Sequence, residues 1–319
     1  MRSQRVLAVL GEDETALRTA AALAERHGAA LLALATVEPP HDLAIAARIA
    51  GQAPEALLNA LAERCRADAR EALAHAALDR EVTLEIRVGK AFIEIIRFAI
   101  ERDCDFVVKA AEPLSGINRF LFASTDQHLL RKCPCAIWLQ TGGAAPAPRR
   151  VLATVDLDTW DAAEPETLGD LNRRVIDAAR SIAAPRGAEI VVLHAWEALG
   201  EGMVWAFSGG QDARVSAETY VNEIVDTRHR AMHQLLAEAA PCSGLTLIPR
   251  LARGTPEAAI CETARALEAD VVVMGTVART GLAGVFIGNT AENIINTLTC
   301  PVLAVKPRDF VSPLDPITH

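Results

Sequence analysis

The chain has 319 residues, of which 51% are apolar and 4% aromatic, and its formal net charge is −9. This length fits about two domains of ordinary size, and the acidic balance argues against nucleic acid or an anionic membrane surface as the main partner. The sequence has no run of 18 apolar residues, so no transmembrane helix is expected. The apolar stretch Val6–Leu10 is too short for a signal peptide, so we expect a cytoplasmic protein.

Apolar strands and amphipathic helices alternate along the chain. In the first half we expect strands at 5–11, 30–37, 82–88, 105–110 and 135–140, and helices at 13–28, 53–79, 91–103 and 125–132. In the second half we expect strands at 150–156, 189–195, 245–251, 270–275 and 301–306, and helices at 167–185, 213–239, 256–268 and 290–298. This alternation predicts an α/β fold with parallel sheets.

An internal duplication is visible in the spacing of residues. Gly89 stands as far before Asp105 as Gly254 stands before Asp270, and an apolar strand follows each aspartate. Each unit is far longer than a solenoid repeat, so the pattern indicates two duplicated domains. The Gly-, Ala- and Pro-rich stretch 141–148 reads as a linker. We therefore expect one domain at 1–143 and a second at 147–310.

The segment that follows Val271–Met274 is the best candidate for a phosphate site. The apolar run predicts a buried parallel strand that turns at Gly275. Gly288 allows a positive φ or a close backbone approach, and Asn289 and Glu292 have the spacing of an N-cap and a capping box. The free N–H groups and the dipole of a helix N-terminus both attract anions.

The same segment resembles the signature of the universal stress protein family, which is Gly, two residues, Gly, nine residues, Gly, then Ser or Thr. Gly275 and Gly288 match the first and last glycines, whereas Ala278 replaces the second Gly and Asn289 replaces Ser or Thr. The inner Arg279–Gly281 and the run that follows Gly288 look most like the tandem, E-type members of the family. The resemblance covers nearly the whole chain because of the duplication.

This resemblance implies two doubly wound, Rossmann-like α/β domains in tandem, each with a five-stranded parallel sheet, that associate as an intrachain pseudo-dimer. It also implies a role in stress survival through binding and regulation, with no committed catalytic cycle; a slow ATPase is the enzymatic alternative. Edge strands invite pairing, so the strands at 136–140 and 302–306 are expected to meet and to bury Ile137, Leu139 and Leu303.

We expect ATP or AMP to bind the second domain only. By resemblance, Asp156 at the end of the first strand of that domain contacts the nucleotide. The other expected contacts lie in the signature segment, namely Gly275, Arg279, Gly288, Asn289 and Thr290. The alternative for Asp156 is a turn acid that caps a loop, and for Arg279 it is a solvated loop charge.

The first domain is not expected to bind ATP. It has Gly11 at the position of Asp156, it lacks all three signature glycines, and its Glu112 would repel phosphate. The apolar side chains in its loop would form an apolar wall or lid instead: Leu114, Ile117, Phe120, Leu121 and Phe122. The alternative function for the whole protein is therefore a scaffold without a nucleotide, or a carrier of an apolar small ligand.

No metal site is expected from the cysteines and histidines. The seven cysteines should be reduced thiols that pack as small apolar residues. His229 and His233 are four residues apart on an expected helix, but a zinc site needs more ligands. His128 is interpreted as a packing or capping residue and not as a catalytic base.

Overall fold

The computed structural model describes residues 4–11, 14–112, 125–141, 145–158, 165–208, 212–239, 245–276 and 288–315. The chain divides into two compact units. The first contains Met1–Ala147 and Thr299–His319, and the second contains Pro148–Gly281 and Gly288–Leu298. The domain boundaries expected from the sequence, 1–143 and 147–310, stay a prediction.

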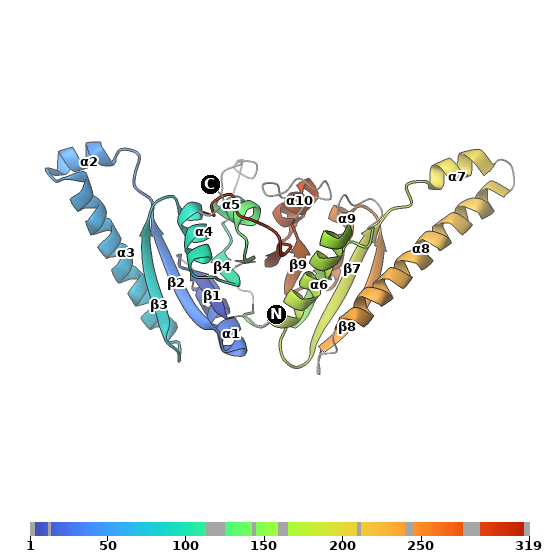
Figure 1. Ribbon diagram of the computed structural model, residues 1–319, viewed down its shortest axis with the longest axis horizontal. Coiled ribbons are helices and arrows are strands. Elements are labelled where there is room, and N and C mark those ends of the chain that lie inside the picture. Colours follow the sequence, from blue (N-terminus) through green and yellow to red (C-terminus); the bar gives the residue numbers. More distant parts are fainter. Residues whose placement is uncertain are drawn as a thin grey trace. The chain divides into compact units, whose positions relative to one another are not determined.

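The first unit is built on a parallel sheet, of which Figure 1 labels β1 to β4, and it also contains one antiparallel strand. Its strands lie in the order β3-β2-β1-β4-β5-β10. They are β1 (Arg5–Val9), β2 (Ala30–Val37), β3 (Val82–Val88), β4 (Phe106–Ala110), β5 (Ala136–Gln140) and β10 (Val302–Val305). Its helices are α1 (Thr15–His27), α2 (Leu43–Ala50), α3 (Pro54–Ala76), α4 (Ala91–Glu101) and α5 (Thr125–Lys132).

The two strands that were expected to meet do pair. β5 and β10 run antiparallel, with Val302 opposite Leu139 and Leu303 opposite Trp138. Ile137, Leu139 and Leu303 are all buried. Pairing removes the exposed backbone groups that make an edge strand prone to unwanted association. A pseudo-two-fold relation between the domains stays a prediction.

The second unit repeats the arrangement of the first. Its strands lie in the order β9-β6-β7-β8 and are parallel to one another. They are β6 (Arg150–Thr154), β7 (Ala188–Trp196), β8 (Leu245–Arg253) and β9 (Val271–Gly275). Its helices are α6 (Pro165–Ile182), α7 (Glu201–Ser208), α8 (Asp212–Glu238), α9 (Pro256–Ala266) and α10 (Asn289–Thr297). The same order of four strands appears in both units as β4-β1-β2-β3 and β9-β6-β7-β8, which is the expected duplication.

The apolar strands form the core, as a parallel sheet covered by helices requires. Val271, Val272 and Val273 of β9 are fully buried. In the second unit α6 packs on β6 and β9, α9 packs on β7, and α8 packs on β8. None of the helices in the described part of the chain is both long and apolar enough to span a membrane.

Most expected elements are found within a few residues of their predicted bounds, but two helices were missed. α2 and α7 each have only eight residues and lie in segments to which no helix was assigned from the sequence. Pro256 occupies the first turn of α9, where a missing backbone N–H costs little. Thr255 caps that helix, since its hydroxyl accepts a hydrogen bond from the backbone N–H of Ala258 at 3.4 Å.

Candidate functional site

The candidate site lies in the second unit, at the carboxyl ends of β6 and β9. Thr154 of β6 is opposite Met274 of β9 in parallel register. Asp156 and Thr276 each follow two residues later, so the chain leaves the sheet at neighbouring points. β7 lies on one side of β6 and β9 lies on the other, so the direction in which the strands are added reverses between β6 and β9. Ligands of open α/β sheets bind at such a switch point.

The N-terminus of α10 is held at this edge by its backbone. The N–H of Gly288 donates to the carbonyl of Thr276 at 3.2 Å, and the carbonyl of Gly288 accepts from the N–H of Glu292 at 3.0 Å. The first N–H groups of α10 thus lie close to the end of β9. A helix N-terminus in this place can receive an anion.

Two expectations about this helix start were wrong. The N-cap is Gly288 and not Asn289, because an extended backbone at Gly288 (φ −62°, ψ 140°) provides the N-cap geometry one residue earlier. Asn289 is then the first helical residue, so Asn289 and Glu292 do not have the positions of a capping box. Because the φ angle of Gly288 is negative, this position does not need a glycine in order to adopt a left-handed conformation. The close approach of the backbone is the remaining reason for a glycine there.

Gly275 is required by packing against a helix. A Cβ atom at this position would lie 2.6 Å from Cδ2 and 3.0 Å from Cγ of Leu171, a buried residue of α6. The absence of a side chain therefore lets α6 lie against the end of β9. This packing role explains Gly275 without reference to a ligand.

Thr276 is a polar residue of the site that the sequence analysis missed. It is fully buried, and its hydroxyl oxygen has no hydrogen-bond partner within the described residues. A buried hydroxyl without a partner destabilises the fold by about 1–3 kcal/mol. Its position directly after an apolar strand and a glycine is the sequence signal that could have identified it.

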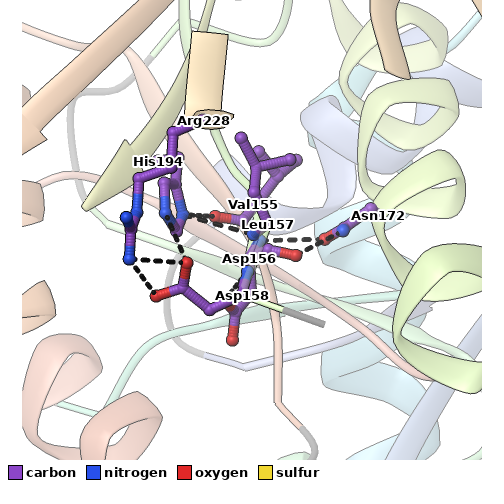
Figure 2. A network of polar contacts seen from close by, with 7 residues as sticks. All are labelled: Val155, Asp156, Leu157, Asp158, Asn172, His194 and Arg228. Carbon is purple, nitrogen blue, oxygen red and sulfur yellow. Dashed lines mark hydrogen bonds and ion pairs between the residues drawn. The ribbon is translucent and has the colours of Figure 1, made fainter. Parts of the chain in front are cut away.

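Asp156 forms a turn at the end of β6. Its backbone N–H donates to Oδ1 of Asn172 at 2.9 Å, and Nδ2 of Asn172 donates to its carbonyl at 2.6 Å. Its carboxylate oxygen Oδ1 accepts from the N–H of Asp158 at 3.1 Å, which is an Asx-turn. The turn-acid interpretation of Asp156 therefore describes its contacts in the structure (Figure 2).

Next to this turn, Asp158 joins a buried ion-pair network that the sequence analysis missed (Figure 2). A guanidinium nitrogen of Arg228 lies 3.0 Å and 3.2 Å from the two carboxylate oxygens, and Nε2 of His194 lies 3.5 Å from one of them. Burial raises the pKa of Asp158, but the hydrogen bonds and charges of His194 and Arg228 outweigh burial and lower it overall. Asp158 is therefore ionised at neutral pH.

The same network fixes the backbone of the turn. Nδ1 of His194 lies 3.3 Å from the N–H of Leu157 and 3.3 Å from the carbonyl of Val155. The ionised carboxylate of Asp158 favours a proton on Nε2, which leaves Nδ1 to accept from Leu157. A lone histidine within the apolar strand β7 was the signal for this contact, because a buried imidazole needs polar partners.

The structure brings together three of the expected site residues, namely Asp156, Gly275 and Gly288. Asn289 begins α10, and Thr290 is exposed on its first turn. Arg279 and Ala278 lie outside the described residues, and so does the apolar stretch 114–122 of the first half.

The corresponding edge of the first unit is occupied by an internal ion pair. Asp126 in the first turn of α5 lies 2.8 Å from Nζ of Lys109 at the end of β4, and it accepts the N–H of Glu112 at 2.7 Å. Burial raises the pKa of Asp126, and the charge of Lys109 opposes this. The chain's own carboxylate thus lies where an anionic ligand would meet the helix N-terminus.

Three of the described cysteines are buried and pack as apolar residues, whereas Cys65, Cys261 and Cys300 are part-exposed. Cys104, Cys133 and Cys135 are buried. Burial raises the pKa of Cys104 to about 12, and a hydrogen bond with Cys133 together with burial raises the pKa of Cys135. Such thiols stay protonated and are poor nucleophiles.

The histidines that the sequence singled out have packing contacts. His128 stacks on Phe92 with 3.9 Å between ring centroids, which agrees with a packing role. His229 and His233 are exposed and their ring centroids are 6.4 Å apart. Within the described residues, no group of three or more His, Cys, Asp or Glu side chains is placed to hold a metal ion.

Comparisons with known proteins agree with this architecture. The model of the universal stress protein family matches residues 4–139 and 168–306. The chain is 30% identical to universal stress protein E of Salmonella typhi over 244 residues, which is 75% of this chain and 73% of that protein. It is 29% identical to universal stress protein E of Escherichia coli K12 over 242 residues, with the same coverage.

Two solved structures share the fold over nearly the whole chain. A functionally unknown protein from Pseudomonas aeruginosa PAO1 has a TM-score of 0.64 at 24% identity and covers 96% of this chain and 94% of its own. A universal stress protein from Archaeoglobus fulgidus has a TM-score of 0.62 at 16% identity and covers 97% and 98%. With the family model matched in both halves, the chain belongs to the universal stress protein family as a tandem member.

Proposed function

We propose that this protein is a regulatory binding protein whose second unit holds an adenine nucleotide, ATP or AMP. The observation that carries the proposal is the buried hydroxyl of Thr276, which has no partner within the described residues and lies beside the N-terminus of α10. A phosphate oxygen at that point would accept hydrogen bonds from the helix N–H groups and from this hydroxyl.

The other end of the nucleotide would lie along the turn after β6. Asp156 is half-buried, and its backbone is fixed by Asn172. A carboxylate in this position can accept a hydrogen bond from a ribose hydroxyl. The adjacent ionisable groups Asp158, His194 and Arg228 form ion pairs with one another, which favours binding over a committed catalytic cycle.

The proposal is limited to the second unit. In the first unit the carboxylate of Asp126 lies at the N-terminus of α5, bonded to Lys109 and to the N–H of Glu112. A nucleotide phosphate would have to displace this carboxylate or lie beside it, and both are unfavourable by charge.

Isothermal titration of the full chain with ATP and with AMP tests the proposal. Thr276→Val replaces the hydroxyl by a methyl group of similar size, and we expect it to weaken binding about tenfold while stability stays equal or rises. Gly288→Val should abolish binding. Its backbone φ of −62° suits any residue, so the branched side chain blocks the phosphate without strain.

A matched control is Thr263→Val, which removes a hydroxyl from another buried threonine, in α9 of the same unit. We expect this variant to bind as tightly as the parent protein. Absence of binding heat from the parent, or equal affinity for the parent, Thr276→Val and Gly288→Val, would refute the proposed site.

A further inference from the structure

Helix α7 in the second unit has an unusual surface. Its sequence is apolar except for Glu201 at its start and Ser208 at its end, yet none of its residues is buried. Helices that are apolar on all sides are normally buried. Leu199, Met203 and Phe207 follow one another at intervals of four residues and are 62–87% exposed. Met203 and Phe207 therefore lie one turn apart on the same side of the helix, and Leu199 lies in the turn just before it.

Trp205 of α7 and Val215 of α8 are also more than half exposed. We call the five side chains Leu199, Met203, Trp205, Phe207 and Val215 the α7 tip. Figure 1 shows α7 at the end of α8 that extends beyond the sheet of its unit. The tip is anchored, because Arg253 forms an ion pair with Glu201 and the N–H of Gly200 donates to the Tyr220 hydroxyl at 3.1 Å.

We propose that the α7 tip is a self-association surface, which docks on the α7 tip of a second copy of this chain about a two-fold axis. An aromatic side chain can bury about 150–250 Å². Each of the five residues is more than half exposed, so together they expose on the order of 600 Å² of surface. Two copies would then remove about 1,200 Å² from water, which is the lower end of the range for stable interfaces.

The charges next to the tip are self-complementary. Arg214 and Glu218 lie one turn apart on α8, form an ion pair at 2.8 Å, and are both well exposed. In a two-fold interface, every contact between a first residue on one copy and a second residue on the other copy occurs twice, once in each direction. Arg214 of one copy can therefore pair with Glu218 of the other, and the reverse pair forms at the same time.

The same charges disfavour a lipid surface as the occupant. Helices that bind membrane surfaces carry unpaired Lys and Arg that attract anionic headgroups. Arg214, next to Val215, and Arg253, which contacts Glu201 of α7, are each paired with a glutamate. The chain as a whole carries a formal net charge of −9.

The equivalent helix of the first unit offers a weaker surface and therefore a control. α2 exposes two large apolar side chains, Ile45 and Ile49, and it buries Ala47. Replacement of Ile49 by Glu makes the same chemical change as replacement of Phe207 by Glu, but on a surface with much less apolar area.

Sedimentation velocity of the full chain, from about 1 to about 100 µM, tests the proposal. We expect a species of twice the 34.1 kDa chain mass to form in this range. Phe207→Glu should weaken the dimer about 100-fold or more, since one buried Phe is lost from each side. Ile49→Glu should leave the dimer unchanged, and circular dichroism should show both variants folded.

Charge exchange gives a second, independent measurement. Arg214→Glu should weaken the dimer because two acidic residues then face each other, and the double variant Arg214→Glu/Glu218→Arg should restore it. A parent protein that is monomeric throughout the range would overturn the proposal. So would a dimer that resists Phe207→Glu but is lost with Ile49→Glu, or a monomer that binds phosphatidylcholine vesicles through Phe207.

Discussion

Lys306 offers the sharpest test of the energetics of this fold. It follows β10 and is only 2% exposed, and its ammonium group has no hydrogen-bond partner within the described residues. Its ammonium group lies over the ring of Phe310, whose centroid is 4.7 Å from Nζ. An ammonium in such a place destabilises the folded state relative to the unfolded chain, where water solvates it.

The magnitude follows from the pKa of this group. Burial lowers the pKa of Lys306 from 10.5 to about 8, with a small opposing effect from Cys133. That difference corresponds to about 3 kcal/mol by linkage. Lys306→Met keeps the length of the side chain and removes the charge. We expect it to raise the free energy of unfolding at pH 7 by about 1–3 kcal/mol, since desolvation in folded proteins is partly relaxed.

The pH dependence has a definite sign. Between pH 8 and pH 10.5 the unfolded chain binds the Lys306 proton more tightly than the folded chain, so the free energy of unfolding rises with pH in this window. The charge penalty is fully present below about pH 8 and has gone above about pH 10.5. The advantage of Lys306→Met over the parent should therefore disappear at the alkaline end.

The assay is urea unfolding of both proteins at several pH values, followed by circular dichroism. Lys109→Met is the matched control, because Lys109 is also a mostly buried lysine but lies 2.8 Å from Asp126. Its loss leaves a buried carboxylate without its cation and should destabilise by about 3 kcal/mol. The reasoning on Lys306 would be refuted if Lys306→Met also destabilises at pH 7, or if its advantage does not change between pH 7 and pH 11.

Two further predictions concern the second unit. Gly275→Ala should lower the free energy of unfolding by about 1–3 kcal/mol, because the added methyl group overlaps Leu171. In a double-mutant cycle measured by urea unfolding, Leu171→Ala should relieve part of this loss. Strictly additive effects of the two substitutions would contradict a direct contact between these residues. Arg228→Met should destabilise by about 3 kcal/mol at neutral pH because Asp158 loses its buried cation. The lowered pKa of Asp158 stabilises the fold above pH 3.8, and this contribution is lost as pH falls through the folded-state value. The stability gap between the parent and the Arg228 variant should therefore narrow as pH falls below 3.8, and a gap that stays unchanged between neutral and acidic pH would argue against the ion pair.

The fold was largely predictable because its signals are local. The strands Ala30–Val37 and Val82–Val88 match their predicted bounds, since each is a continuous segment between turn residues. The duplication could be read from the equal spacing of glycine and aspartate in the two halves. The family motif located the edge of the sheet at which β9 and α10 meet. It could not show that Gly288 caps the helix, because that depends on backbone angles.

The sequence by itself determined the α/β class, the order of most elements and the duplication, because strand and helix periodicities act over a few residues. Only the tertiary structure decided which polar groups are buried together. Asp158, His194 and Arg228 lie on a loop, a strand and a helix far apart in the chain. Lys306 is buried directly after β10, the strand that pairs with β5, and nothing in its own sequence neighbourhood marks it as buried. Such contacts depend on long-range packing, and local residue patterns carry no record of which distant segments will meet.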